Sequence, residues 1–257
     1  IRWCYTKRAS LREDIIVANS LWIGKKLLPQ NILSINSFLK NEWRYNLYVY
    51  DDVENVPSGV TILDANDILP ESEIWYYKKG FNKGSPSGFS NHFRYKFLYE
   101  NGGYWTDTDI VIDRSSDHFP DVWNYYFISQ WSKSLRRQQV TSSFIFTRQK
   151  KAPIFKSLID YCKNRNKDRV VHGETGPDIL DKMVHKYSLE NNVLHYDTFQ
   201  SINYYEIDKI FTSSVLKHGL VGIHLCDSIW NEKGYTLDMA KKDSVMNYFI
   251  QRYGTES

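Results

Sequence analysis

The stretch "ENGGYWTDTDIVID" (residues 100–113) places two aspartates, Asp107 and Asp109, one residue apart in a segment that otherwise favours a β-strand. Acidic residues are poor strand formers, whereas the flanking Tyr, Trp, Thr, Ile and Val favour strands. If the strand stayed extended, both carboxylates would point the same way, and one would protonate unless a cation lay beside them. Mg²⁺ or Mn²⁺ would remove this penalty, so the pair suggests a metal–diphosphate site. For the motif alone, a turn without any metal is an equal alternative.

Strand and helix patterns alternate on both sides of this stretch. Expected strands cover residues 20–24, 45–52, 59–65, 124–131, 141–147 and 221–225, and a further strand carries the two aspartates. Expected helices cover residues 30–43, 90–103, 152–165, 176–187 and 236–253, with Ser90 as an N-cap and Gly102 as a stop signal. The alternation predicts an α/β fold with a largely parallel sheet. In such sheets ligands bind beyond the carboxyl ends of the strands, where Asp51, Asp52, Asp107 and Asp109 are expected.

Composition narrows the function classes. The net charge is only +3, and the basic residues stand in short runs such as residues 135–139 and 148–151, which argues against a nucleic-acid-binding protein. We favour a solvated surface for these runs over loose contact with an anionic membrane. Cys4, Cys162 and Cys226 are widely separated without a CxxC pair, which fits a reducing compartment such as the cytoplasm. No run of 18 apolar residues predicts a membrane-spanning helix. Without repeats or low-complexity linkers, one domain over residues 1–257 is expected.

The longer run "SNHFRYKFLYENGGYWTDTD" (residues 90–109) resembles the signature of family 32 glycosyltransferases and their relatives, the clostridial glucosylating toxins. That signature has a helix with Ser-Asp and Arg-Tyr, then Leu-Tyr, Gly-Gly, aromatic residues and Asp-x-Asp. The opening "LWIG" (residues 21–24) and residues 34–52 are similar to the first strand, helix and second strand of the family. "GIHLCDSIW" (residues 222–230) is similar to its late segment. The resemblance covers roughly residues 20 to 232.

The resemblance implies a GT-A type fold, with a Rossmann-like, mostly parallel central sheet flanked by helices. It implies a retaining hexosyltransferase that uses Mn²⁺ or Mg²⁺. The donor would be a nucleotide-diphosphate sugar, with a UDP-sugar expected, and the transferred group a hexose or N-acetylhexosamine. The acceptor would be a glycan or lipid-linked glycan, in the synthesis of bacterial capsule or lipopolysaccharide. Such an enzyme would lie in the cytoplasm, with peripheral contact with the inner membrane.

The same resemblance assigns residues to the metal and to the donor. Asp109 would bind the metal and His224 would complete the metal shell. Asp107 would hold the donor ribose and sugar, and touch the metal indirectly. Trp22 would stack on the nucleotide base, and Arg94 would face the donor sugar or its phosphate.

Three further residues complete the expected site. Ser228 and Trp230 would close over the diphosphate and help it depart. Asp178 follows Gly176–Pro177, a good helix opener. It would either line a sugar pocket or belong only to the start of that helix, and the two readings are equally supported.

Asn91 is the main departure from the family pattern, which has Asp directly after the helix-opening Ser. Asn carries no charge and both donates and accepts hydrogen bonds, which puts the donor, and activity itself, in doubt. Trp105 likewise stands where a Tyr is usual. Two alternatives remain open: a haloacid dehalogenase-type phosphohydrolase, and a non-catalytic sugar-nucleotide-binding module, which Asn91 would favour. Ile110–Val111 argue against the phosphohydrolase, which requires a Gly-Thr pair at that place.

Overall fold

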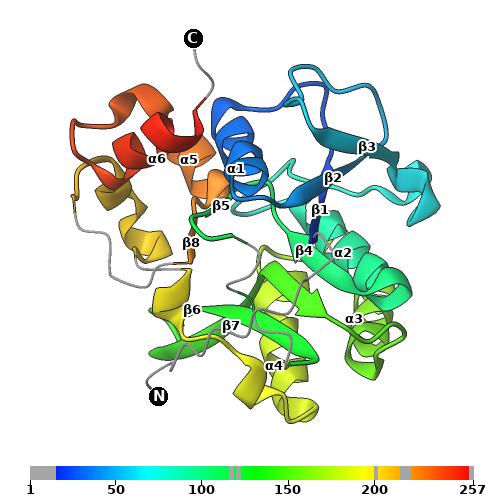
Figure 1. Ribbon diagram of the computed structural model, residues 1–257. Helices are drawn as coiled ribbons and strands as arrows, with labels where there is room; N and C mark the ends of the chain where they lie inside the picture. The colour runs from blue at the N-terminus through cyan, green and yellow to red at the C-terminus, as the bar shows by residue number, and fades with distance from the viewer. Residues whose placement is uncertain (1–15, 116–118, 120–122, 200–201, 215–220, 255–257) are drawn as a thin grey trace, which may run out of the picture.

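A computed structural model describes residues 16–115, 119, 123–199, 202–214 and 221–254, so Cys4 lies outside it. Its centre is a six-stranded sheet in the order β3-β2-β1-β4-β7-β6, beside a separate pair, β5 and β8 (Figure 1). Strands β3, β2, β1 and β4 pair in parallel, and β7 runs antiparallel to both β4 and β6. The strands are β1 (Val17–Trp22), β2 (Arg44–Val49), β3 (Val60–Asp64), β4 (Gly103–Thr106), β5 (Ile110–Ile112), β6 (Tyr125–Ser132), β7 (Arg137–Thr147) and β8 (Gly222–His224). The expected α/β fold with a mostly parallel sheet is confirmed.

Helices begin where the sequence supplies a start signal. Pro29 and Pro153 occupy the first turns of α1 and α3, where proline suits the backbone. Ser244 caps α6 by accepting a hydrogen bond from Asn247 N at 3.1 Å. The helices are α1 (Pro29–Lys40), α2 (Ser87–Asn101), α3 (Pro153–Asn164), α4 (Ile179–Lys186), α5 (Asp227–Lys233) and α6 (Val245–Tyr253).

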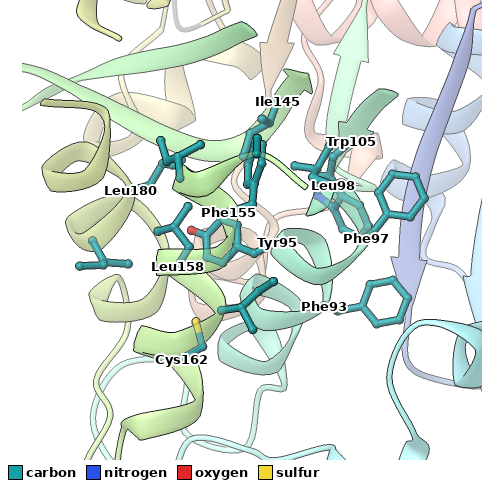
Figure 2. Close-up of a cluster of buried hydrophobic side chains, with 14 of the residues drawn as sticks. Phe93, Tyr95, Phe97, Leu98, Trp105, Ile145, Phe155, Leu158, Cys162 and Leu180 are labelled. Atoms are coloured by element: carbon teal, nitrogen blue, oxygen red, sulfur yellow. The ribbon is translucent and has the colours of Figure 1, made fainter. Parts of the chain in front are cut away.

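The two faces of the sheet are covered by different helices. Along β2, Leu47 packs with α1 on one face while Tyr48 packs with α2 on the other, as strand alternation requires. Figure 2 shows the α2 face, where Phe93 and Phe97 lie with side chains of α3, α4, β4 and β7. A third cluster joins α5 and α6 to the β5–β8 pair. This layering puts the carboxyl ends of β1 and β4 next to β8 and α5.

Three expectations about elements are wrong in detail. Helix α2 begins at Ser87, so Ser90 lies inside it and is not its N-cap. The expected helix over 236–253 is a single turn, Leu237–Met239, followed by α6 from Val245. The strand expected to carry both aspartates ends at Thr106, and a turn separates it from β5.

Candidate functional site

Asp107 and Asp109 lie in the turn between β4 and β5, and their side chains have separate partners. Asp107 N donates to Ser143 O of β7 at 2.7 Å, which ties the start of the turn to the sheet. Ile110 N donates back to Asp107 O at 3.3 Å and closes the turn. Because the backbone turns here, the two carboxylates have different partners, although the Asp109 charge still contributes to a raised pKa of Asp107 after burial, the largest cause.

Arg94 of α2 forms a bidentate ion pair with Asp107. Its Nη2 lies 2.9 Å from Asp107 Oδ1 and its Nη1 lies 3.2 Å from Oδ2. Trp105 Nε1 donates to the same Oδ1 at 3.0 Å. The other N–H groups of Arg94 bond to Ser142 O, Ser90 O and Ser90 Oγ, so all five guanidinium donors have protein partners. Arg94 therefore orients Asp107, and one lone-pair direction of Asp107 stays open toward the cleft.

Asp109 faces the late segment of the chain. His224 Nε2 lies 3.2 Å from Asp109 Oδ2, and Asp227 N donates to the same oxygen at 2.9 Å. The antiparallel β5–β8 pair brings these groups together by matching Ile110 with His224. Cys226 adopts a left-handed backbone conformation with φ of 60°, which turns Asp227 N toward the carboxylate.

Opposite environments shift the two carboxyl groups in opposite directions. Burial raises the pKa of Asp107, and the Arg94 guanidinium offsets part of that rise. Burial would also raise the pKa of Asp109, but His224 outweighs it and holds that pKa below its usual value. For His224, burial alone would lower the pKa, whereas neighbouring Cys226 and Asp109 raise it well above its usual value. Burial followed by the Asp109 charge raises the pKa of Asp227 to about 8. The Asp109 carboxylate thus favours a positively charged group beside it and disfavours a second negative charge on Asp227.

These side chains line a cleft of about 1060 Å³ at the carboxyl ends of β1 and β4. Trp22 lines it from the end of β1, and its indole N–H is buried without a hydrogen-bond partner among the described residues. Ser228 of α5 and Asp178 also line the cleft. Asp178 Oδ1 accepts from Gln139 Nε2 at 3.1 Å, which joins it to β7.

Asn91 lines the same cleft and bridges three elements. Its Nδ2 donates to Thr175 Oγ1 at 3.2 Å, and its Oδ1 accepts from Ser142 Oγ at 3.2 Å. A Cβ at Gly176 would lie 3.0 Å from Asn91 Nδ2, so the backbone approaches the amide closely. One N–H and one lone pair of the amide remain for a ligand.

Trp230 is not brought to the cleft. Its side chain is fully buried and packs on Phe211, with ring centroids 4.9 Å apart. The apolar cluster of α5 and α6 encloses the indole, whose N–H has no hydrogen-bond partner among the described residues, and the expected role at the diphosphate stays a prediction. Asp51 and Asp52 are exposed and do not line the cleft either.

Two residues that the sequence analysis did not single out belong to the site. Asp227 lies beside Asp109, and its Oδ2 accepts from Asn31 Nδ2 at 2.5 Å. Asn31 also donates to Thr108 O at 3.2 Å, so helix α1 supports the turn that carries the aspartates. In the sequence, the position of Asp227 directly before Ser228 could have identified it, whereas no local pattern distinguishes Asn31.

The donor set on the Asp109 side suits a divalent cation. Two ligands in neighbouring octahedral positions at about 2.1 Å stand about 3 Å apart, close to the 3.2 Å between His224 Nε2 and Asp109 Oδ2. Buried Asp227 Oδ1 and His224 Nδ1 have no hydrogen-bond partner among the described residues. The described part of the chain holds no group of three or more His, Cys, Asp or Glu able to bind a metal alone. A cation here would need further oxygen ligands from a substrate or water.

Comparison with known proteins agrees with this geometry. Residues 29–127, less than half of the chain, match the family model described as glycosyltransferase sugar-binding region containing DXD motif. This part of the chain is therefore similar in sequence to the sugar-binding region of glycosyltransferases. The matched range ends within β6 and contains the Asp107–Asp109 turn, and the resemblance to glycosyltransferases expected from the sequence is confirmed there. No curated protein matches the whole sequence at a significant level.

Comparison with solved structures supports the expected GT-A type fold at low sequence identity. The galactosyltransferase LgtC, solved with donor and acceptor sugar analogs, covers 94% of this chain and 98% of its own at 9% identity, with a TM-score of 0.50. Two others score lower: PaToxG glycosyltransferase (0.47, 16% identity, 69% of this chain and 72% of its own) and GlyE of Streptococcus pneumoniae TIGR4 (0.48, 14% identity, 93% of this chain and 64% of its own). Among the described residues, none of the helices combines the length and apolar character that a bilayer crossing requires.

Proposed function

We propose that this chain is a retaining, metal-dependent glycosyltransferase that moves a hexose or N-acetylhexosamine from a UDP-sugar to a glycan hydroxyl. The observation that supports it best is the meeting of Asp109, His224 and Asp227 N in one cleft with the Arg94–Asp107 pair. Such a cleft offers a cation site on one side and an oriented carboxylate on the other. The two halves fit the charged diphosphate and the hydroxyl-rich sugar of one donor.

Asp109 and His224 would hold the divalent cation, and when bound it would supply positive charge against the diphosphate. Trp22 offers its indole as a platform for the base, at the end of β1. Ser228 provides a hydroxyl beside the diphosphate position. These groups favour the departing nucleotide because negative charge grows on it as the glycosyl bond breaks.

Asp107 accepts hydrogen bonds from Arg94 and Trp105 and would use its open direction for a ribose or sugar hydroxyl. Asn91 and Asp178, which line the same cleft, would contact the sugar ring. Arg94 serves as a positioning residue, because its donors are already engaged with protein acceptors. The acceptor hydroxyl would then attack the face that the diphosphate leaves, which retains the configuration.

The test is a panel of sugar nucleotides incubated with Mn²⁺, with and without oligosaccharide acceptors, while nucleotide release is followed. We expect turnover with one donor, loss of turnover after chelation, and loss in Asp109→Ala. Asp168→Ala, at an exposed position, is the matched control. Equal turnover by wild type and Asp109→Ala would exclude the metal role, and binding without turnover would favour a sugar-nucleotide-binding module. The anomeric configuration of the product, measured by NMR, tests retention.

We also propose that the chain acts as one domain in the cytoplasm, in the synthesis of capsule or lipopolysaccharide. Cys162 and Cys226 are both free and buried, which is compatible with a reducing compartment. A strain lacking the protein should lose a defined sugar from its surface polysaccharide. Unchanged polysaccharide composition would contradict this part of the proposal without affecting the transferase assignment.

A further inference from the structure

Exposed apolar side chains gather around the mouth of the cleft. Among the described residues, nine large apolar side chains are well exposed, and six of them lie in two loops near the cleft or in or next to residues that contact those loops. These six are Tyr76, Phe81, Trp131, Leu135, Val171 and Tyr205. Exposed apolar groups scattered singly are ordinary, but their concentration at one place indicates an interaction surface.

The first of these loops, residues 75–84, is firmly anchored. Tyr77 N donates to Ser85 O at 3.1 Å and Gly84 N donates to Tyr77 O at 2.9 Å. Trp75 fills the space over Gly88 of α2, where no Cβ would fit. At the tip, Phe81 packs on His172 with ring centroids 5.0 Å apart and lines the cleft. The loop therefore holds Tyr76 and Phe81 at the surface by its own hydrogen bonds.

The second loop is the tip of the β6–β7 hairpin, residues 131–136. Trp131 packs on Tyr196 with ring centroids 5.8 Å apart, yet stays 37% exposed. Lys133 Nζ lies 5.4 Å from the ring centre of Tyr205, which also lines the cleft. Gln130, directly before the tip, lines it too. Both loops thus border the same opening.

Cations accompany the apolar groups in both loops. Residues 75–84 contain Lys78, Lys79 and Lys83 and no acidic residue, and the hairpin tip adds Lys133 and Arg136. Within the part of the chain that the structure describes, none of the five forms an ion pair with a carboxylate. Aromatic rings with free lysines match the headgroup region of an anionic bilayer, which offers negative charge and an apolar layer beneath it.

We propose that loops 75–84 and 131–136 dock the mouth of the cleft onto an anionic lipid surface. The aliphatic members, Leu135 and Val171, favour lipid over nucleic acid, because a nucleic acid offers them no apolar layer. Docking would present the cleft to an acceptor held in the membrane. The proposal does not depend on the transferase assignment, since lipid binding is measured without donor or metal.

Binding to vesicles of equal parts phosphatidylglycerol and phosphatidylcholine, measured by cosedimentation, tests this surface. We expect binding to the mixed vesicles, little binding to pure phosphatidylcholine, and weakening as salt screens the charges. Each lysine near a charged membrane contributes about fivefold in affinity, so Lys78→Glu/Lys79→Glu/Lys83→Glu should lose at least about 100-fold. Tyr76→Ser/Trp131→Ser should lose about tenfold while the salt dependence stays the same.

The control carries the same change of charge elsewhere: Lys182→Glu/Lys241→Glu/Lys242→Glu, at exposed lysines outside both loops. It should keep most of the binding, and thermal unfolding should show that all variants are folded. An equal loss in the control triple, or equal binding to pure phosphatidylcholine, would overturn the proposal. Binding to soluble polyphosphate without binding to either kind of vesicle would also overturn the proposal.

Discussion

Two histidines with little solvent exposure, one on α2 and one on β8, show how neighbouring groups decide the pKa of a shielded side chain. His92 on α2 is 3% exposed, and burial together with nearby Lys167, Lys163 and Lys96 lowers its pKa to about 4. The His224 side chain on β8 is 17% exposed, and although burial lowers its pKa, Cys226 and Asp109 raise it well above the usual value. The surroundings of His92 therefore disfavour a positive charge, whereas those of His224 favour one. A site for a cation is built by the second arrangement and not by the first.

Removing the carboxylate of Asp109 should have the largest effect of the variants described here. It also removes one of the groups that raise the pKa of His224 above that of His92. We expect Asp109→Asn to lower kcat/KM at least about 1000-fold, because the cation and the diphosphate lose their anchor. In the metal-free variant the pKa of His224 should fall, and imidazole NMR titration would measure it. Asp168→Asn should match wild type. An unchanged His224 pKa would show that Asp109 does not set it.

Arg94 tests the other side of the cleft. Replacing Arg94 by Gln leaves the Asp107 carboxylate without its cation, and we expect a loss of about 3 kcal/mol in the free energy of unfolding. The double variant with Asp107→Asn should recover at least about 1 kcal/mol of this loss. Urea denaturation of the four proteins gives the coupling. Strictly additive losses would mean that the ion pair contributes nothing by itself.

His92 predicts a pH dependence of stability. Because its pKa is about 4 in the folded chain and about 6.5 when unfolded, the unfolded state binds more protons between these values, and stability falls as pH falls through this window. Between pH 7.5 and 5 the loss due to His92 should be about 2 kcal/mol. His92→Leu should remove that part of the loss, as urea unfolding at both pH values would show. An equal loss of stability in wild type and His92→Leu between these pH values would contradict the assignment of this pH dependence to His92.

The smallest expected effect is that of Asn31→Ala, which tests how α1 supports the β8 side of the cleft. Asn31→Ala removes the bonds to Asp227 Oδ2 and Thr108 O, and should cost about 1–2 kcal/mol of stability. Asn36→Ala on the same helix is the control, since Asn36 makes one bond, to Tyr253 O, and should cost less. Thermal unfolding compares them. A larger loss of stability in Asn36→Ala than in Asn31→Ala would show that α1 stabilises α6 more than it stabilises the site.

Much of the fold could be predicted because the pattern is local. Periodic apolar positions give β2, α1 and α3, and Gly102, with its φ of 67°, marks the end of α2 before β4. The turn at Asp107–Asp109 could not be predicted, because the flanking residues favour a strand. The bond from Asp107 N to Ser143 O and the pairing of β5 with β8 impose the turn through distant contacts.

The location of most expected site residues also followed from the motifs. Trp22, Asn91, Asp178 and Ser228 line one cleft although they are far apart in the chain. Trp230 could not be placed, because only the packing of α5 and α6 shows that its indole is enclosed. The engagement of every Arg94 donor is likewise invisible in the sequence, since two of its acceptors are backbone oxygens.

The short ladder between β5 and β8 has a consequence for how the protein is made. His224 follows Asp109 by 115 positions, so the two meet only after these further residues have been added to the chain. Since the amino-terminal part of a chain emerges first from the ribosome, the sheet can begin to assemble while the cation site is still incomplete. A nascent chain stalled before β8 would contain the sugar-binding signature but lack His224, one of the two proposed metal ligands. The turn that carries Asp109 would thus be synthesised well before the strand that supplies its His224 partner.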